Sequence, residues 1–135
     1  MMPTLLLVAP IRAGKGEAWR RFTQTLAEAG HDDHAASRRR AGIDSEALWL
    51  VETAYGQLGV VSLTAPDPQA TVRTLARSGE PFDCWFQQQL LDLCGLSLAQ
   101  PALAFPADML FDWQSQPALD LADDLTETPE RKTEC

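Results

Sequence analysis

The sequence predicts one small α+β domain with an antiparallel sheet, and three observations support this class. The 135 residues are the usual size of a single domain. Apolar residues make up 45% of the chain and charged residues 22%, which is typical of a globular protein with a packed core. Segments of strand and helix character follow in the order strand, helix, strand, strand, helix, strand. We therefore expect a domain over residues 1–113 and a separate tail over residues 114–135.

The first strand is predicted from the continuous apolar run Thr4–Ile11, which ends before Ala13-Gly14. A run without alternating polar residues indicates a central strand covered on both faces. We do not expect a signal peptide, because no basic region precedes the run and no small-residue cleavage site follows it. The run is also shorter than the roughly 20 residues that a membrane-spanning helix needs.

A helix is predicted from Lys15 to Ala29, because its large apolar residues recur at helical spacing on one side. Those residues are Trp19, Phe22, Leu26 and Ala29. Gly30 suits the position just after the helix. Residues 31–42 are polar and charged, with several alanines, and predict either a short helix or an ordered loop.

Two strands over residues 46–54 and 58–65 are predicted to form a hairpin. Both are rich in apolar and β-branched residues, and Tyr55-Gly56 between them supplies the turn.

Two further helices are expected after the hairpin. Asp67-Pro68 supplies an N-cap and a first helical residue, and the helix that they begin ends at Ser78-Gly79. The second runs from Pro81 to Gly95, with apolar residues at steps of three and four.

The end of the chain predicts less structure. Leu96–Pro106 is a connector punctuated by proline, and Met109–Trp113 predicts a final short strand. Residues 114–135 hold 6 acidic and 2 basic residues and few large apolar ones, so we expect this acidic tail to be disordered.

The predicted order of elements is that of the ferredoxin-like βαββαβ fold, an antiparallel sheet with its helices on one face. The opposite face of such a sheet is left uncovered. Pairing face to face with a second copy is the simplest way to bury it, so we expect a homodimer.

Charge and cysteine content disfavour several classes of partner and compartment. The net charge of −8 disfavours binding to nucleic acid or to an anionic membrane surface. Cys84 and Cys94 are ten positions apart on one predicted helix, which is too far for a disulfide, and Cys135 ends the tail. Without a disulfide framework, a cytoplasmic location is the natural expectation.

Four segments of the chain resemble a family of short bacterial proteins of uncharacterised function. They are Gly14-Lys15-x-x-x-Trp19, Arg40-x-Gly42-Ile43-x-x-Glu46-x-x-Trp49-Leu50, Tyr55-Gly56, and Ser78-Gly79-Glu80-Pro81-Phe82-Asp83-x-Trp85-Phe86. That family is grouped with the dimeric α+β barrels, the superfamily of the antibiotic-biosynthesis monooxygenases. The resemblance covers about residues 4–100 and implies a dimeric α+β barrel. It implies no particular chemistry, because the superfamily includes cofactor-free oxygenases, isomerases, haem enzymes and proteins without known activity.

Histidine occurs only at His31 and His34, with Asp32 and Asp33 between them. A metal site would need a further ligand from elsewhere in the chain, so we predict none. A haem would need one of these histidines as its axial ligand, and we rank that reading last. His34 is instead a candidate general base, because an imidazole titrates near neutral pH.

The run Arg38-Arg39-Arg40 is the one concentration of positive charge. Arg40 is the candidate for binding an anionic group of a substrate. Its alternative role is an ion pair with the nearby Asp44 or Glu46.

Aromatic and acidic residues supply the remaining candidates. Trp49 and Trp85 are predicted to wall an apolar ligand pocket between sheet and helices, with Tyr55 and Asp83 as further ligand-binding residues. The alternative for the tryptophans is the hydrophobic core, and for Asp83 it is a favourable position at a helix N-terminus.

These observations leave two functions open. The first is a small-molecule-binding protein, such as a cofactor-independent oxygenase or isomerase, that takes an apolar or anionic ligand and uses His34 and Arg40. The second is a non-enzymatic dimeric module that works through protein partners.

Overall fold

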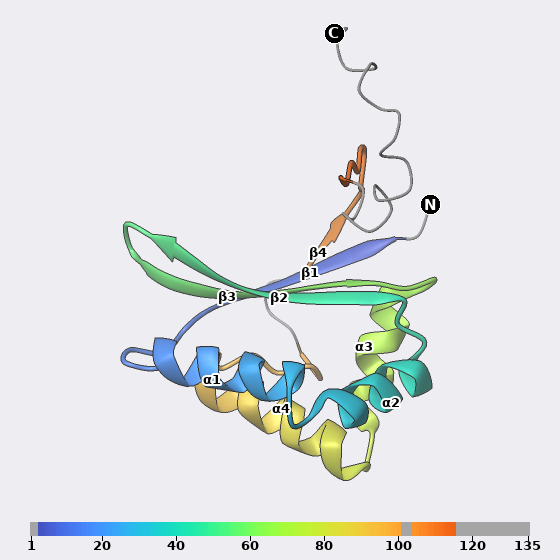
Figure 1. Ribbon diagram of the computed structural model, residues 1–135, viewed down its shortest axis with the longest axis horizontal. Helices are drawn as coiled ribbons and strands as arrows, with labels where there is room; N and C mark the ends of the chain where they lie inside the picture. The colour runs from blue at the N-terminus through green and yellow to red at the C-terminus, as the bar shows by residue number, and fades with distance from the viewer. Residues whose placement is uncertain (1–2, 101–103, 116–135) are drawn as a thin grey trace, which may run out of the picture.

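The protein is a small α+β structure with a four-stranded antiparallel sheet and four helices, described here by a computed structural model that covers residues 3–100 and 104–115. The elements are β1 (Thr4–Pro10), α1 (Gly16–Ala27), α2 (His31–Ala41), β2 (Ser45–Thr53), β3 (Gly56–Thr64), α3 (Pro68–Arg77), α4 (Pro81–Cys94) and β4 (Ala104–Ala107). The strand order is β2-β3-β1-β4, and every neighbouring pair is antiparallel. All four helices lie on one side of the sheet (Figure 1).

The hydrophobic core fills the space between the sheet and the helices. Alternate residues of the strands point into it, as Leu5 and Leu7 of β1 do. From the helices, buried residues include Trp19, Phe86 and Leu90. The core therefore occupies the space in which the sequence predicts a ligand pocket.

Gly59 of β3 is needed where α1 crosses the sheet. A Cβ atom on this residue would lie 3.0 Å from the side chains of both Ile11 and Trp19. The missing side chain lets the Trp19 indole lie against the strand.

Most predicted elements are confirmed. The segment after α1, predicted as a helix or an ordered loop, is the helix α2, and Gly42 ends it with a left-handed φ of 79°. The predicted β2–β3 hairpin is present, but its turn is Ala54-Tyr55, one position before the predicted Tyr55-Gly56, and Gly56, which pairs with Thr53, begins β3. At the start of α3 the Asp67 side chain accepts a hydrogen bond from the Ala70 amide at 3.2 Å, which confirms the predicted N-cap.

Three predictions differ from the structure. The helix α1 ends at Ala27 rather than Ala29, and Gly30 immediately precedes α2. β1 is central in the sheet, but helices cover only one of its faces. The last strand is Ala104–Ala107, which pairs with β1, whereas residues 109–113 form no strand. Residues 116–135, most of the predicted acidic tail, lie outside the described part of the chain.

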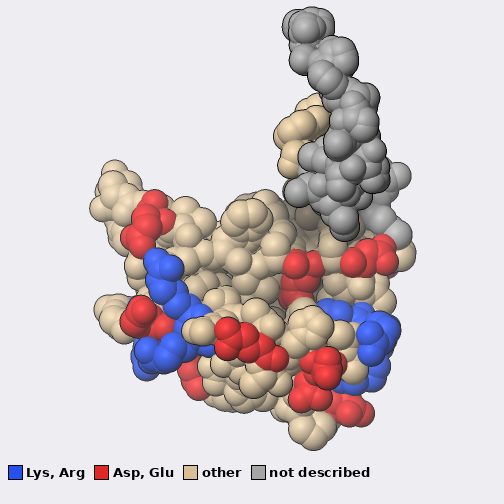
Figure 2. All heavy atoms as spheres, viewed as in Figure 1, with Lys and Arg blue, Asp and Glu red and all other residues tan. Residues whose placement is uncertain are grey.

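The face of the sheet away from the helices, here called the open face, carries no charged side chain on its strands. The strand registers and the burial pattern place the following residues on it: Thr4, Leu6, Val8, Pro10, Ser45, Ala47, Trp49, Val51, Thr53, Leu58, Val60, Ser62, Thr64, Phe105 and Ala107. Most charged side chains visible in Figure 2 lie over the helices instead.

Candidate functional site

The residues predicted to form one site lie in separate regions. Trp49 lies on the open face and is 55% exposed, whereas Trp85 belongs to the helical layer. The two tryptophans therefore do not wall one pocket between sheet and helices. Tyr55 lies at the tip of the β2–β3 hairpin and is 99% exposed.

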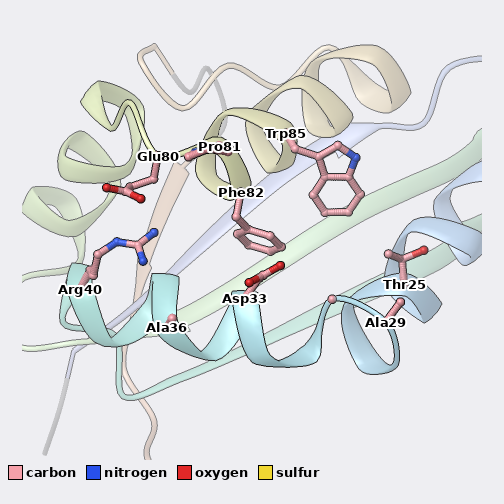
Figure 3. Close-up of a pocket in the computed structure, with 10 residues that line it drawn as sticks. Thr25, Ala29, Asp33, Ala36, Arg40, Glu80, Pro81, Phe82 and Trp85 are labelled. Carbon is pink, nitrogen blue, oxygen red and sulfur yellow. The ribbon is translucent and has the colours of Figure 1, made fainter.

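Arg40 and Trp85 do line the same cavity, here called the helical groove. It has a volume of about 520 Å³ and lies between the α1–α2 turn, α2 and the start of α4 (Figure 3). It is lined by Thr25, Ala29, Gly30, Asp33, Ala36, Arg40, Glu80, Pro81, Phe82 and Trp85.

Aromatic rings form the main wall of the helical groove. Phe82 and Trp85 are three positions apart on α4 and so project from the same side, with ring centroids 5.5 Å apart. Trp85 also packs against Phe22 of α1 at 5.6 Å. Because both rings are half-buried against the core, this wall is held in place by its packing.

The charged residues of the groove are unevenly placed. Arg40 and Glu80 lie together at one end, and Asp33 projects from α2 nearer the middle (Figure 3). One nitrogen of the Arg40 guanidinium, Nη2, donates a hydrogen bond to Asp83 at 3.2 Å. The groove thus has an apolar body and one polar end that carries both signs of charge.

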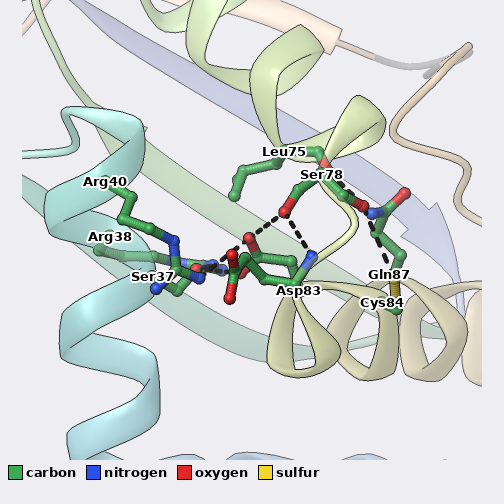
Figure 4. Close-up of polar contacts among 9 residues, drawn as sticks. Ser37, Arg38, Arg40, Leu75, Ser78, Asp83, Cys84 and Gln87 are labelled. Atoms are coloured by element: carbon green, nitrogen blue, oxygen red, sulfur yellow. Dashed lines mark hydrogen bonds and ion pairs between the residues drawn. The ribbon is translucent and has the colours of Figure 1, made fainter.

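Asp83 is buried, with 3% of its surface exposed, and is surrounded by hydrogen-bond donors (Figure 4). Its carboxylate accepts hydrogen bonds from the Ser37 and Ser78 hydroxyls and from Arg40. Burial acts to raise the pKa of Asp83, but the hydrogen bonds from Ser37, Ser78 and Arg40 outweigh it and hold the pKa below its usual value of 3.8. The carboxylate is therefore ionised at neutral pH.

Glu46 of β2 forms a second buried cluster with two residues of α2. Its oxygens accept two hydrogen bonds from Arg38, at 2.7 and 3.0 Å, and Nε2 of His34 lies 2.7 Å from Oε1. Burial would raise the pKa of Glu46, but the contacts with His34 and Arg38 lower it below 4.5 overall. An ionised carboxylate can only accept hydrogen bonds, so Nε2 of His34 must carry the hydrogen that it donates to Glu46. In a neutral imidazole, Nδ1 is then the nitrogen with a free lone pair.

The two clusters are joined into one network. Nη1 of Arg38 donates a hydrogen bond to the Ser37 hydroxyl at 2.8 Å, and Ser37 donates in turn to Asp83. Ser37 has no exposed surface, and the Arg38 and Glu46 side chains are 7% and 4% exposed. The network ties α2 to β2 and to the start of α4. Ser37, Arg38, Glu46 and Asp83 are buried and paired with one another, whereas the Arg40 and His34 side chains at the two ends are 43% and 25% exposed.

The predicted partner of Arg40 is therefore corrected. Arg38, not Arg40, pairs with Glu46, and Arg40 pairs with Asp83, 43 positions along the chain. Sequence reasoning assigned no role in a site to Ser37, Arg38 or Ser78. The spacing of His34, Ser37 and Arg38 at steps of three and four was the available signal, because it places three polar residues on one side of α2.

His34 and Arg40, the two catalytic candidates, open on different depressions. The one beside His34 has a volume of about 270 Å³ and is lined by Thr23, Leu26, Ala27, His34, Glu46, Ala47 and Leu48. Arg40 lines the helical groove and a smaller depression beside Asp83. The two side chains therefore do not form a single reaction centre.

Comparison with known proteins adds no functional assignment: no protein-family model, curated protein or solved structure matches the chain. Within residues 3–100 and 104–115, no three histidine, cysteine or acidic side chains gather so as to hold a metal ion. Across the same residues no helix is long and apolar enough to cross a membrane.

Proposed function

We propose that the protein binds a small amphipathic molecule in the helical groove. The observation that carries this proposal is the wall of Phe82 and Trp85, which ends at the guanidinium of Arg40. A volume of about 520 Å³ is within the range of small-molecule sites, which combine apolar walls with a few polar groups.

The charges of the groove favour one kind of ligand. A planar apolar body would lie against the two rings, and a polar head would lie between Arg40 and Glu80. Arg40 retains donors beyond the one given to Asp83, because its guanidinium has five N–H groups. Glu80 and Asp33 oppose a strongly anionic ligand, so a head that both accepts and donates hydrogen bonds fits best.

We propose binding rather than catalysis in the groove, because the base predicted from the sequence lies elsewhere. A cofactor-independent oxygenase or isomerase reaction requires a base beside the bound molecule. His34, the candidate base, opens on a different depression from the helical groove. Binding is thus the activity that the arrangement of side chains supports.

An uncharged fluorescent probe with an apolar ring system and a carbonyl acceptor, 6-propionyl-2-(dimethylamino)naphthalene, tests the groove. We expect the probe to brighten with the wild type and its affinity to fall about tenfold or more in Trp85→Ala, because a buried aromatic contact exceeds about 1.4 kcal/mol. Arg40→Gln should weaken binding of the probe less, since Arg40 meets only its carbonyl group.

Trp49→Ala is the matched control, because it removes an indole from the open face and leaves the groove intact. Its probe affinity should equal that of the wild type. Unchanged binding in Trp85→Ala together with lost binding in Trp49→Ala would place the probe on the sheet and contradict the proposal.

A second candidate function, homodimerisation, is favoured by the open face. We propose that the chain adopts the ferredoxin-like arrangement and pairs through this face as a dimeric α+β barrel. A fully hydrated sheet face would be expected to carry charges, but this one carries none on its strands and exposes Trp49, Val51 and Phe105. In a two-fold interface the same patch meets itself. An uncharged patch can do this without repulsion, although the chain as a whole has a net charge of −8.

Light scattering with a charge placed on the open face tests the dimer. We expect the wild type to have twice the chain mass of 14.8 kDa at micromolar concentration and Trp49→Glu to have the single mass. Tyr55→Glu adds the same charge at the hairpin tip and should remain dimeric. A wild type that is monomeric throughout the micromolar range contradicts dimerisation.

A further inference from the structure

Residues 108–113, here called the arm, concentrate exposed large apolar side chains. Leu110, Phe111 and Trp113 are 89%, 83% and 72% exposed, and Met109 is 46% exposed. Water contact with four large apolar side chains in five positions is unfavourable, so this surface indicates an interaction site.

The arm has an alternating pattern. In an extended chain, Met109, Phe111 and Trp113 project to one side, and Asp108, Leu110 and Asp112 project to the other. One side is thus entirely apolar, and the other carries both carboxylates. Such a segment can dock through the first side and keep its charges in water.

The position of the arm limits what it can dock on. It follows β4, which pairs with β1, and it leaves the sheet on the side of the open face, away from the helices (Figure 1). The large exposed fractions of Leu110, Phe111 and Trp113 show that the arm does not lie against its own sheet. It therefore extends into the space that a second copy would occupy in a face-to-face dimer.

The length of the arm and the lack of charge on the open face both suit docking on a second copy of the chain. Stacked sheets lie about 10 Å apart, whereas six extended residues span about 20 Å. The arm can therefore cross from one sheet to the other and continue along it. The open face of the second copy has no charged side chain on its strands, so it offers an apolar surface to Met109, Phe111 and Trp113 without burying a charge.

We propose that the arms are exchanged between two copies, so that Met109, Phe111 and Trp113 of each chain pack on the open face of the other. The exchange rests on the proposed dimer and goes beyond it. In a two-fold symmetric dimer each copy supplies one arm and receives one, so the arm and the open face of both chains are buried together. The arm becomes part of the interface that each chain needs to bury its sheet.

Photo-crosslinking of the full chain tests the exchange. A p-benzoylphenylalanine in place of Phe111 should, on irradiation, join two chains and give a band of twice the chain mass. Mixing chains with and without a short affinity tag should give a mixed dimer. The same substitution at Tyr55, which is 99% exposed at the hairpin tip, is the control and should give no such band.

Measuring the dimer Kd of a variant arm distinguishes a wrong prediction of arm exchange from a wrong prediction of dimerisation. The double variant Phe111→Ser/Trp113→Ser should raise the dimer Kd at least about tenfold, since a buried aromatic anchor contributes one such factor or more. A wild type that scatters as a dimer but crosslinks Phe111 only within its own chain, or keeps its Kd in the double variant, overturns the exchange alone. A wild type that scatters as a monomer overturns both the dimer and the exchange.

Discussion

Replacing Glu46 by alanine is expected to lower the free energy of unfolding by about 3–5 kcal/mol, because it leaves a buried guanidinium without its counter-ion. Arg38 is 7% exposed in its side chain and gives two of its hydrogen bonds to Glu46. His34 loses its partner in the same change. Urea denaturation at neutral pH measures the loss.

Two further variants show whether the buried charge is the cause. Glu52→Ala removes an exposed carboxylate from the same strand, where it accepts one hydrogen bond from Gln57, and should cost less than about 1 kcal/mol. The double change Arg38→Met/Glu46→Leu should recover most of the stability, because an apolar pair fills the space without an unpaired charge. Equal losses for Glu46→Ala and Glu52→Ala would contradict a buried ion pair.

Acid should destabilise the protein through the same carboxylates. The pKa values of Glu46 and Asp83 are lower in the folded protein than their usual values of 4.5 and 3.8. A depressed folded pKa adds stability that is complete above the unfolded value and is lost as the pH falls towards the folded value. Between pH 7 and about 5, we therefore expect these two residues to leave the free energy of unfolding independent of pH. Below about pH 4.5, we expect them to contribute to a steep loss of that free energy.

Denaturation curves at pH 7, 5, 4 and 3 check this expectation. Glu46→Gln has no charge to lose at that position, so its stability should fall less between pH 5 and pH 3 than that of the wild type. Parallel losses in the two proteins would show that Glu46 has the same pKa in both states.

Local signals in the sequence predicted most of the fold. Asp67-Pro68 and Gly95 mark helix ends because capping depends on the residue itself, and Gly56 beside the hairpin turn, with a φ of 130°, marks the hairpin for the same reason. The last strand was misplaced because the pairing of β4 depends on the edge of β1. Ala104–Ala107 is short and contains a proline, which strand propensity disfavours, but a proline is tolerated on an edge strand.

The site was harder to predict because it depends on contacts between distant segments. Arg40 and Trp85 were chosen for their chemistry, and both line the helical groove. Trp49 and Trp85 looked equivalent as large aromatics, yet they lie on the two sides of the sheet–helix sandwich. The ion pairs also depend on contacts between distant segments. Arg40 pairs with Asp83, 43 positions along the chain, and forms no ion pair with the nearby Asp44. Sequence distance alone does not identify such partners.

Phe86→Ala should be as damaging as the loss of Glu46, at about 3–5 kcal/mol, the usual cost of removing a buried phenylalanine. Phe86 is 2% exposed, and its ring packs on Phe22 and Phe82 with centroids 5.4 and 6.3 Å away. The guanidinium carbon of Arg38 lies 4.2 Å from its centroid, so the change also removes the apolar surface beneath the buried ion pair.

Trp85→Ala is the matched comparison, because Trp85 is the next residue on α4 and points about 100° away around the helix. Its indole is half-buried and lines the helical groove, so its loss leaves a wider groove rather than a closed cavity in the core. We expect Trp85→Ala to cost clearly less than Phe86→Ala in a pair of denaturation curves, and to retain a folded groove for the probe titration. Equal large losses would show that Trp85 is a core residue, and the wall of the proposed ligand site would then be a structural contact.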